Sequence, residues 1–167
     1  MKKLVLFSSL FLFGVSAMFS QGNFRAGAHL GLPIGDAGDL ATFAIAVDLG
    51  YILEISENFE AGPIIGYQHS FGDEVNVGGF NIDVDDVQFL PIGGEARFNI
   101  SDSPFSLRAQ LGYALGINDG NDGGFYYSPQ VSYGVSESTD IVLAFRGISR
   151  DGGSWDVLSL GVEFGID

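Results

Sequence analysis

The sequence of 167 residues contains no cysteine and almost no lysine. Without cysteine it can form neither a disulfide framework nor a lipid attachment, so strand pairing and packing alone must hold the fold. The two lysines, Lys2 and Lys3, lie at the N-terminus, and every later basic residue is an arginine. Water-exposed β proteins normally carry lysine on their polar faces and edge strands. Its absence therefore disfavours an ordinary soluble surface.

A hydrophobic run long enough to cross a membrane as a helix is also missing. The apolar run Leu4–Phe13 is shorter than the ~20 residues that a transmembrane helix needs. It follows the two lysines and precedes small residues up to Ala17, which is the layout of a secretory signal peptide. We expect export, with residues 1–20 removed by cleavage after Ala17 or Ser20 and a mature domain over residues 21–167. The alternative is an N-terminal membrane anchor.

Basic residues are few: 7 lysines and arginines stand against 21 aspartates and glutamates, which gives a formal net charge of -14. Because both lysines lie in the expected leader, the mature chain is more acidic still, and we expect no nucleic-acid partner. Its basic residues are Arg25, Arg97, Arg108, Arg146 and Arg150. The rigid, permanently charged guanidinium suits a confined ion-pair network better than a solvated surface.

What the sequence does contain is period-two alternation of apolar and polar residues, the pattern of β-strands with two unlike faces. The segment 42–53 is the clearest, with large apolar residues at odd positions from Phe43 to Leu53 and Thr42, small residues and Asp48 between them. Its length suits a membrane-spanning strand of about ten residues. The eight segments of this kind are 24–32, 42–53, 59–71, 88–98, 105–117, 125–135, 141–146 and 158–166.

Three places depart from this simple pattern. Pro63 cannot donate a ladder hydrogen bond, so we expect a bulge or local distortion there. The segment 88–98 is the least regular, because the run 89–92 interrupts the alternation. Residues 75–84 form a smaller hairpin with a Gly-Gly turn, which predicts a two-stranded ribbon beyond the main sheet. We read Ser149–Ser154 as a loop.

The polar faces of these strands hold glycine, alanine, serine, glutamine and charged residues. A soluble sandwich would also alternate, with its apolar face buried. Small residues on the polar face, aromatic residues near strand ends and the missing lysine favour a narrow barrel with its apolar face in lipid. The sequence thus predicts an all-β fold, an eight-stranded antiparallel up-and-down transmembrane β-barrel in a Gram-negative outer membrane. An even strand count places both termini in the periplasm and the longer loops outside.

These features, with the closing Leu-Ser-Leu-Gly-Val-Glu-Phe segment, resemble the small eight-stranded outer-membrane β-barrel proteins, the porin-like or outer membrane protein beta-barrel domain family. The resemblance covers nearly the whole mature chain and is architectural. It implies outer-membrane lipid, lipopolysaccharide and the barrel assembly machinery as partners, and a monomer. Such barrels commonly finish on an aromatic residue, whereas Gly165, Ile166 and Asp167 follow Phe164 here. The assembly signal is thus displaced or variant.

The candidate site is a charge network inside the barrel. Charges enclosed in a narrow barrel must be matched, because an unpaired buried charge is costly. The network either seals the lumen or forms a gate or narrow ion pathway. Its predicted members are Arg25, Asp48, Glu60, Glu95, Arg97, Arg108, Arg146 and Glu163.

Acidic residues also crowd the longest connection between strands. Carboxylates could bind calcium or magnesium there, but no EF-hand spacing is present, and solvated loop charges are the simpler interpretation. The weak candidate ligands are Asp73, Glu74, Asp83, Asp85 and Asp86. We expect no cofactor.

Catalytic motifs are missing as well. His69 and Ser70 are adjacent and so point to opposite faces of a strand, which makes them a poor catalytic pair. We therefore expect no catalytic residues and a non-enzymatic cell-envelope protein with a plugged lumen, in an envelope-structural or surface-interaction role. A porin-like conduit for small or hydrophobic solutes is the alternative, and a lipid A-modifying enzyme is a more distant one. The outer loops, including the ribbon, could meet an extracellular partner.

Overall fold

The computed structural model describes residues 22–77 and 79–166. The expected leader, its cleavage positions at Ala17 and Ser20, and the last residue, Asp167, lie outside the described residues. None of the described residues forms a helix long and apolar enough to cross a membrane. The only helical element among them is the short 3-10 turn η1, Gly35–Ala37.

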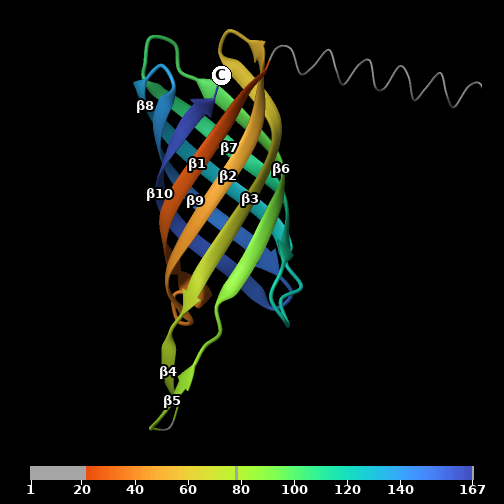
Figure 1. Cartoon of the computed structure of the whole chain (residues 1–167), viewed down its shortest axis with the longest axis vertical. Coiled ribbons are helices and arrows are strands. Elements are labelled where there is room, and N and C mark those ends of the chain that lie inside the picture. Colours follow the sequence, from red (N-terminus) through yellow and green to blue (C-terminus); the bar gives the residue numbers. More distant parts are fainter. Residues whose placement is uncertain (1–21, 78, 167) are drawn as a thin grey trace, which may run out of the picture.

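The described chain folds into a closed antiparallel barrel with the strand order β1-β10-β9-β8-β7-β6-β3-β2 (Figure 1). The predicted ribbon is a separate two-stranded sheet, β4-β5, which projects from the barrel. The strands are β1 Gly22–Ile34, β2 Ala41–Ser56, β3 Phe59–Gly72, β4 Glu74–Val77, β5 Phe80–Asp83, β6 Val87–Asn99, β7 Phe105–Gly116, β8 Gly124–Ser136, β9 Thr139–Arg150 and β10 Gly153–Ile166. The predicted fold class is confirmed.

The barrel has two unlike ends (Figure 1). At one end lie the start of β1, the C-terminus and the turns β2–β3, β6–β7 and β8–β9, and we name it the terminal end. At the other end, the hairpin end, lie η1, the β4-β5 ribbon, the β7–β8 loop and the β9–β10 turn. With both termini at one end, the hairpin end corresponds to the predicted outer side.

The faces of the strands follow the predicted alternation. On β1, Leu30 is 69% exposed on the outside, whereas the neighbouring His29 is 5% exposed inside the barrel. The same alternation of large exposed apolar residues and small or polar buried ones runs along the other barrel strands. The apolar face of the sheet therefore covers the outside of the barrel.

The segment 88–98, whose sequence pattern is the least regular, forms a regular part of β6 in the structure. Phe89 and Pro91 are buried inside, and the outward Ile92 continues a strict alternation. The expected break was wrong because an apolar residue can fill the interior of a narrow barrel as well as a polar one can.

The β2–β3 pair refines one expectation and corrects another. The register is the same on both sides of Pro63, since Gly50 pairs with Ile64 and Leu53 with Ala61, so the expected irregularity is a break in the pairing with β2 at Gly62 and Pro63, without a bulge. A register shift lies instead between Ala41 and Phe43. This shift leaves Thr42 exposed rather than on the inner face where the alternation predicted it.

The final hairpin is longer than predicted. β9 continues to Arg150 and β10 begins at Gly153, so only Asp151 and Gly152 connect them. Gly152 has a φ of 90°. Glycine adopts such a positive φ readily because it has no Cβ, and tight hairpin turns often need it. The loop expected over Ser149–Ser154 is therefore mostly paired strand, and Trp155 lies inside the barrel.

Candidate functional site

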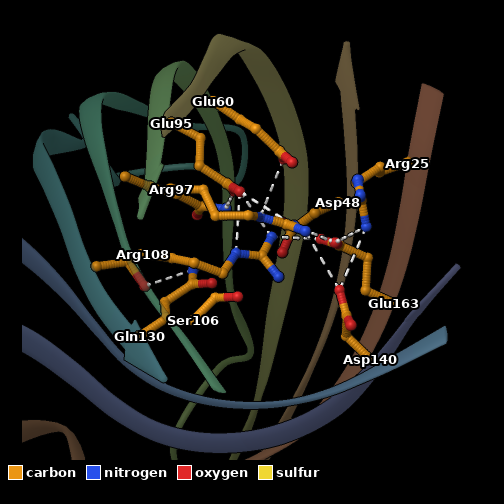
Figure 2. Close-up of polar contacts among 12 residues, drawn as sticks. Arg25, Asp48, Glu60, Glu95, Arg97, Ser106, Arg108, Gln130, Asp140 and Glu163 are labelled. Atoms are coloured by element: carbon orange, nitrogen blue, oxygen red, sulfur yellow. Dashed lines mark hydrogen bonds and ion pairs between the residues drawn. The ribbon is translucent and has the colours of Figure 1, made fainter. Parts of the chain in front are cut away.

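All eight residues of the predicted charge network lie on the inner faces of barrel strands, and six strands beyond β1 contribute to it. Figure 2 labels all of them except Arg146. Most of their side chains are almost completely removed from solvent. They are Arg25 on β1, Asp48 on β2, Glu60 on β3, Glu95 and Arg97 on β6, Arg108 on β7, Arg146 on β9 and Glu163 on β10.

Most of the network forms one belt in the terminal half of the barrel. Glu163 receives hydrogen bonds from both Arg97 and Arg108, which come from the opposite part of the wall. Arg108 Nε also donates to Glu95 Oε1 at 2.9 Å. Glu60 completes this side through an Arg97 Nε to Oε2 separation of 3.7 Å. The belt therefore ties strands together that are not neighbours in the sheet.

Asp140 belongs to this belt, although it lies between the predicted strand segments 125–135 and 141–146. Its Oδ2 lies 3.2 Å from Arg25 Nη1 and 3.2 Å from Arg97 Nη1. Figure 2 shows it beside Glu163 at the edge of the belt. The signal was available, because Asp140 is in phase with the inward residues Val142, Ala144 and Arg146 of β9.

A second ion pair joins Asp48 and Arg146 near the middle of the barrel, with Arg146 Nη1 3.3 Å from Asp48 Oδ1. His29 Nε2 lies 3.3 Å from Asp48 Oδ2 on its other side. Alternation in the predicted segment 24–32 puts His29 on the polar, inward face, but it does not show that His29 meets Asp48.

A bridge of uncharged side chains connects the Asp48 pair to the belt. Tyr126, which accepts a hydrogen bond from Arg146, donates its hydroxyl to Gln110 Oε1 at 2.8 Å. Gln110 Nε2 then donates to Glu95 Oε2 at 2.7 Å. In this joined network, four guanidinium groups face five carboxylates. This near balance is what buried charges require.

Towards the hairpin end the interior becomes apolar. Phe89 and Trp155 are fully buried with their ring centroids 6.4 Å apart. Trp155 Nε1 donates to Ser70 Oγ at 3.0 Å, which satisfies the one polar atom of the indole. Ala37, Ile148 and other buried apolar residues pack around them. We name Phe89, Trp155 and Ile148 the aromatic layer, and sequence reasoning missed it because it expected only small and charged residues inside.

The five acidic residues suggested as weak metal ligands have other partners or remain apart. Asp86 Oδ2 lies 2.8 Å from His69 Nε2, and its Oδ1 accepts from the Gly72 amide at 2.9 Å. Asp73 accepts from the amide of Glu74. Within the described ranges, no group of three or more histidine or carboxylate side chains is arranged to hold a metal ion. The structure thus does not bring Asp73, Glu74, Asp83, Asp85 and Asp86 together as one site.

The two halves of the adjacent histidine and serine pair lie on opposite sides of the wall. His69 is outside, where Nδ1 is 3.0 Å from the Tyr67 hydroxyl, and Ser70 is inside beneath Trp155. Among the hydrogen bonds of the described residues, none joins a serine hydroxyl to a histidine. The geometry offers no activated serine in this part of the chain.

Comparison with protein-family models gives no match, and no curated protein matches the sequence. Solved structures do match. Ail of Yersinia pestis, determined in a phospholipid bilayer nanodisc, superposes with a TM-score of 0.59 at 15% identity over 87% of this chain and 100% of Ail. The N-terminal β-barrel domain of Pseudomonas aeruginosa OprF gives 0.54 at 15% identity, over 87% of this chain and 98% of that domain.

A de novo designed transmembrane β-barrel gives a TM-score of 0.55 at 12% identity, over 87% of this chain and 97% of the design. At such low identities these likenesses show the fold alone. The chain therefore has the fold of small outer-membrane proteins, a closed eight-stranded antiparallel β-barrel of the transmembrane type. The resemblance inferred from the alternating segments is confirmed at this level.

Proposed function

We propose that this protein is a non-enzymatic outer-membrane β-barrel whose sealed lumen makes it a scaffold for envelope structure or surface interaction. The observation that carries the proposal is the continuous filling of the interior. A belt of ion pairs occupies the terminal half, and the aromatic layer occupies the hairpin half. An eight-stranded barrel has only enough room for such side chains, whereas wide aqueous pores need about sixteen strands.

The outer surface supports insertion in a membrane. Aromatic pairs lie near both ends of the barrel, with apolar side chains between them. The ring centroids of Phe105 and Tyr133 are 5.1 Å apart near the terminal end. Those of Phe43 and Phe71 are 4.3 Å apart near the hairpin end. Two aromatic bands around an apolar belt are typical of barrels that span an outer membrane. The proposal includes export by the leader, contact with lipid and lipopolysaccharide, insertion by the barrel assembly machinery, and a monomeric state.

Planar-bilayer recording of the purified full-length mature protein tests the sealed lumen. We expect no steady conductance at neutral pH, and heat-dependent gel migration of the same sample verifies that the barrel is folded. Steady, reproducible channels from folded protein would support the conduit instead. Unchanged lipid A in an expressing host, measured by mass spectrometry, is expected because no serine hydroxyl is hydrogen-bonded to a histidine among residues 22–77 and 79–166. Altered lipid A would overturn the non-enzymatic part.

A surface-interaction role is favoured by the charge of the hairpin end. Ail has been solved with the heparin analogue sucrose octasulfate, but the hairpin end of this chain carries an excess of carboxylates that would repel a polysulfated ligand. We propose that a protein partner at this end is basic. The acidic residues there are Asp36, Asp39, Asp73, Glu74, Asp83, Asp85, Asp86, Asp119, Asp122 and Asp151. Binding that strengthens as salt is lowered would support this role, and salt-independent binding would contradict it.

A further inference from the structure

The hairpin end carries a hollow that the sealed-lumen proposal does not use. It lies between the β7–β8 loop and the β9–β10 turn and has a volume of about 440 Å³. Tyr113, Asp122, Phe125, Ser149, Arg150 and Asp151 line it, together with three glycines, and we name it the rim pocket. Its volume falls in the ~300–1,000 Å³ range of small-molecule sites.

Arg150 sets this pocket apart from the interior. Arg25, Arg97, Arg108 and Arg146 all form ion pairs inside the barrel, whereas Arg150 forms none with a described residue. Its guanidinium carbon instead lies 5.4 Å from the centre of the Trp155 ring. Trp155 is held in turn by its hydrogen bond to Ser70. The guanidinium therefore lies against the Trp155 ring, and its donors form no side-chain hydrogen bond with the described part of the chain.

The other residues that line the pocket supply carboxylate acceptors, glycine main-chain groups and aromatic rings. Asp122 and Asp151 line the hollow, and neither carboxylate is a partner in the ion pairs found among the described residues. Tyr113 donates its hydroxyl to the main-chain oxygen of Asp122 at 3.2 Å, which ties the loop to the wall. Tyr113 and Phe125 are 48% and 53% exposed as whole residues. The pocket thus combines charged hydrogen-bonding groups with exposed aromatic edges.

Glycine lets the β7–β8 loop and the start of β8 pack directly against the neighbouring backbone. A Cβ at Gly123 would lie 2.1 Å from the main-chain oxygen of Ala114, and one at Gly124 would lie 2.1 Å from that of Ser149. Gly120 and Gly123 also have φ values of 77° and 75°, which side chains rarely adopt. Because Gly120, Gly123 and Gly124 line the hollow, only main-chain groups face it at these positions.

We propose that the rim pocket binds a neutral sugar unit. Two carboxylates against one guanidinium disfavour an anionic ligand, and charged donors and acceptors disfavour a purely apolar one, because they would lose their hydration without replacement. A sugar ring has hydroxyls that both donate to carboxylates and accept from a guanidinium. Its C–H face can pack on the exposed aromatic rings. The proposal does not depend on whether the lumen is sealed.

Saturation-transfer NMR on the folded protein in phospholipid nanodiscs tests the site, with maltose, cellobiose and diacetylchitobiose as neutral probes and sucrose octasulfate as the anionic one. We expect at least one neutral disaccharide to bind and the sulfated sugar not to bind at this site. Ser149→Trp should fill the pocket without changing its charge and weaken binding at least about tenfold, or roughly 1.4 kcal/mol. Arg150→Gln should also weaken it.

Ser136→Trp, an exposed serine at the terminal end, is the matched control and should bind like the wild type. Folding of each variant is verified by heat-dependent gel migration. If none of the neutral disaccharides binds, or if Ser149→Trp binds them as the wild type does, the proposal is overturned. Nanodiscs containing lipopolysaccharide distinguish the source of the sugar: loss of disaccharide binding there indicates the lipid's own sugars, and unchanged binding indicates a free glycan.

Discussion

Asp48 on β2 and Arg146 on β9 form a buried ion pair although 98 positions separate them along the chain and their strands are not neighbours in the sheet. Only closure of the barrel brings them together. Asp48→Asn leaves the fully buried guanidinium without its carboxylate, so we expect a loss of about 3–5 kcal/mol in the free energy of unfolding. Urea unfolding in detergent micelles, followed by Trp155 fluorescence, measures it.

Two further variants provide the comparison for this loss. Asp102→Asn changes an exposed aspartate in the β6–β7 turn and should change the unfolding free energy by less than about 0.5 kcal/mol. Replacing both partners, Asp48→Asn with Arg146→Met, should be less destabilising than Asp48→Asn alone, because no unpaired charge remains. Equal effects of Asp48→Asn and Asp102→Asn would show that the ion pair is not buried.

The two-layer filling of the lumen makes a prediction about conductance. Glu163→Gln removes the carboxylate that Arg97 and Arg108 share, but leaves the aromatic layer. Trp155→Ala opens the aromatic layer, but leaves the belt. We expect each single variant to remain without steady conductance in planar bilayers and the double variant to show a clear increase. If Glu163→Gln alone conducts as strongly as the double variant, the aromatic layer is no barrier.

Trp155 is the only tryptophan in the sequence and lies inside the barrel. Its emission should be blue-shifted and only weakly quenched by acrylamide in the folded protein. Brominated lipid chains should also quench it weakly, because the wall separates it from lipid. Leu158→Trp in a Trp155→Phe background places the indole on the outer face and should be strongly quenched by the same lipids. Strong lipid quenching of Trp155 itself would show that the face of β10 that carries Trp155 is turned towards lipid and not towards the lumen.

The hydrogen bonds of the Asp86 carboxylate, where the ribbon joins the barrel, should be lost at acidic pH. The Gly72 amide and then His69, through their hydrogen bonds to its carboxylate, lower the pKa of Asp86 below its usual range. A carboxyl group with a lowered pKa stabilises the fold above the ordinary carboxyl range, and this contribution is lost as the pH falls through the lowered pKa. We expect the Gly72 amide NMR signal to shift at acidic pH and the Asp86→Asn variant to lack this transition. A Gly72 signal that titrates identically in both proteins would rule out the contact.

The sequence predicts features that depend on neighbouring residues better than contacts that depend on the whole barrel. Alternation is local, so it placed residues such as Leu30 and His29 on the correct faces without knowledge of the barrel. It also placed the charged residues inside. The partners of those residues depend on the register and tilt of all eight strands together, so the contacts of Glu163 with Arg97 and Arg108 could not be read from the pattern.

The errors have a common physical cause. Asp140 and Trp155 lie in stretches rich in serine, glycine and aspartate, which propensity assigns to turns. In a closed barrel, pairing with the neighbouring strand continues through such stretches, as the Gly153 and Arg150 pair shows. The sequence pattern puts Phe89 in an interruption of the alternation, because only small or charged residues are expected inside the barrel. Tertiary pairing and filling of the lumen overrode the local signal in each case.

The accessibility of spin labels attached to single cysteines tests the orientation of the barrel wall most directly. The chain has no cysteine, so Leu160→Cys on the outer face and Ser159→Cys on the inner face each introduce a single probe on β10. With a nitroxide label in lipid vesicles, position 160 should be accessible to oxygen but not to a water-soluble nickel relaxant, and position 159 should be protected from both. Free access of the nickel relaxant to position 160, with no enhancement by oxygen, would contradict a barrel whose apolar side faces lipid.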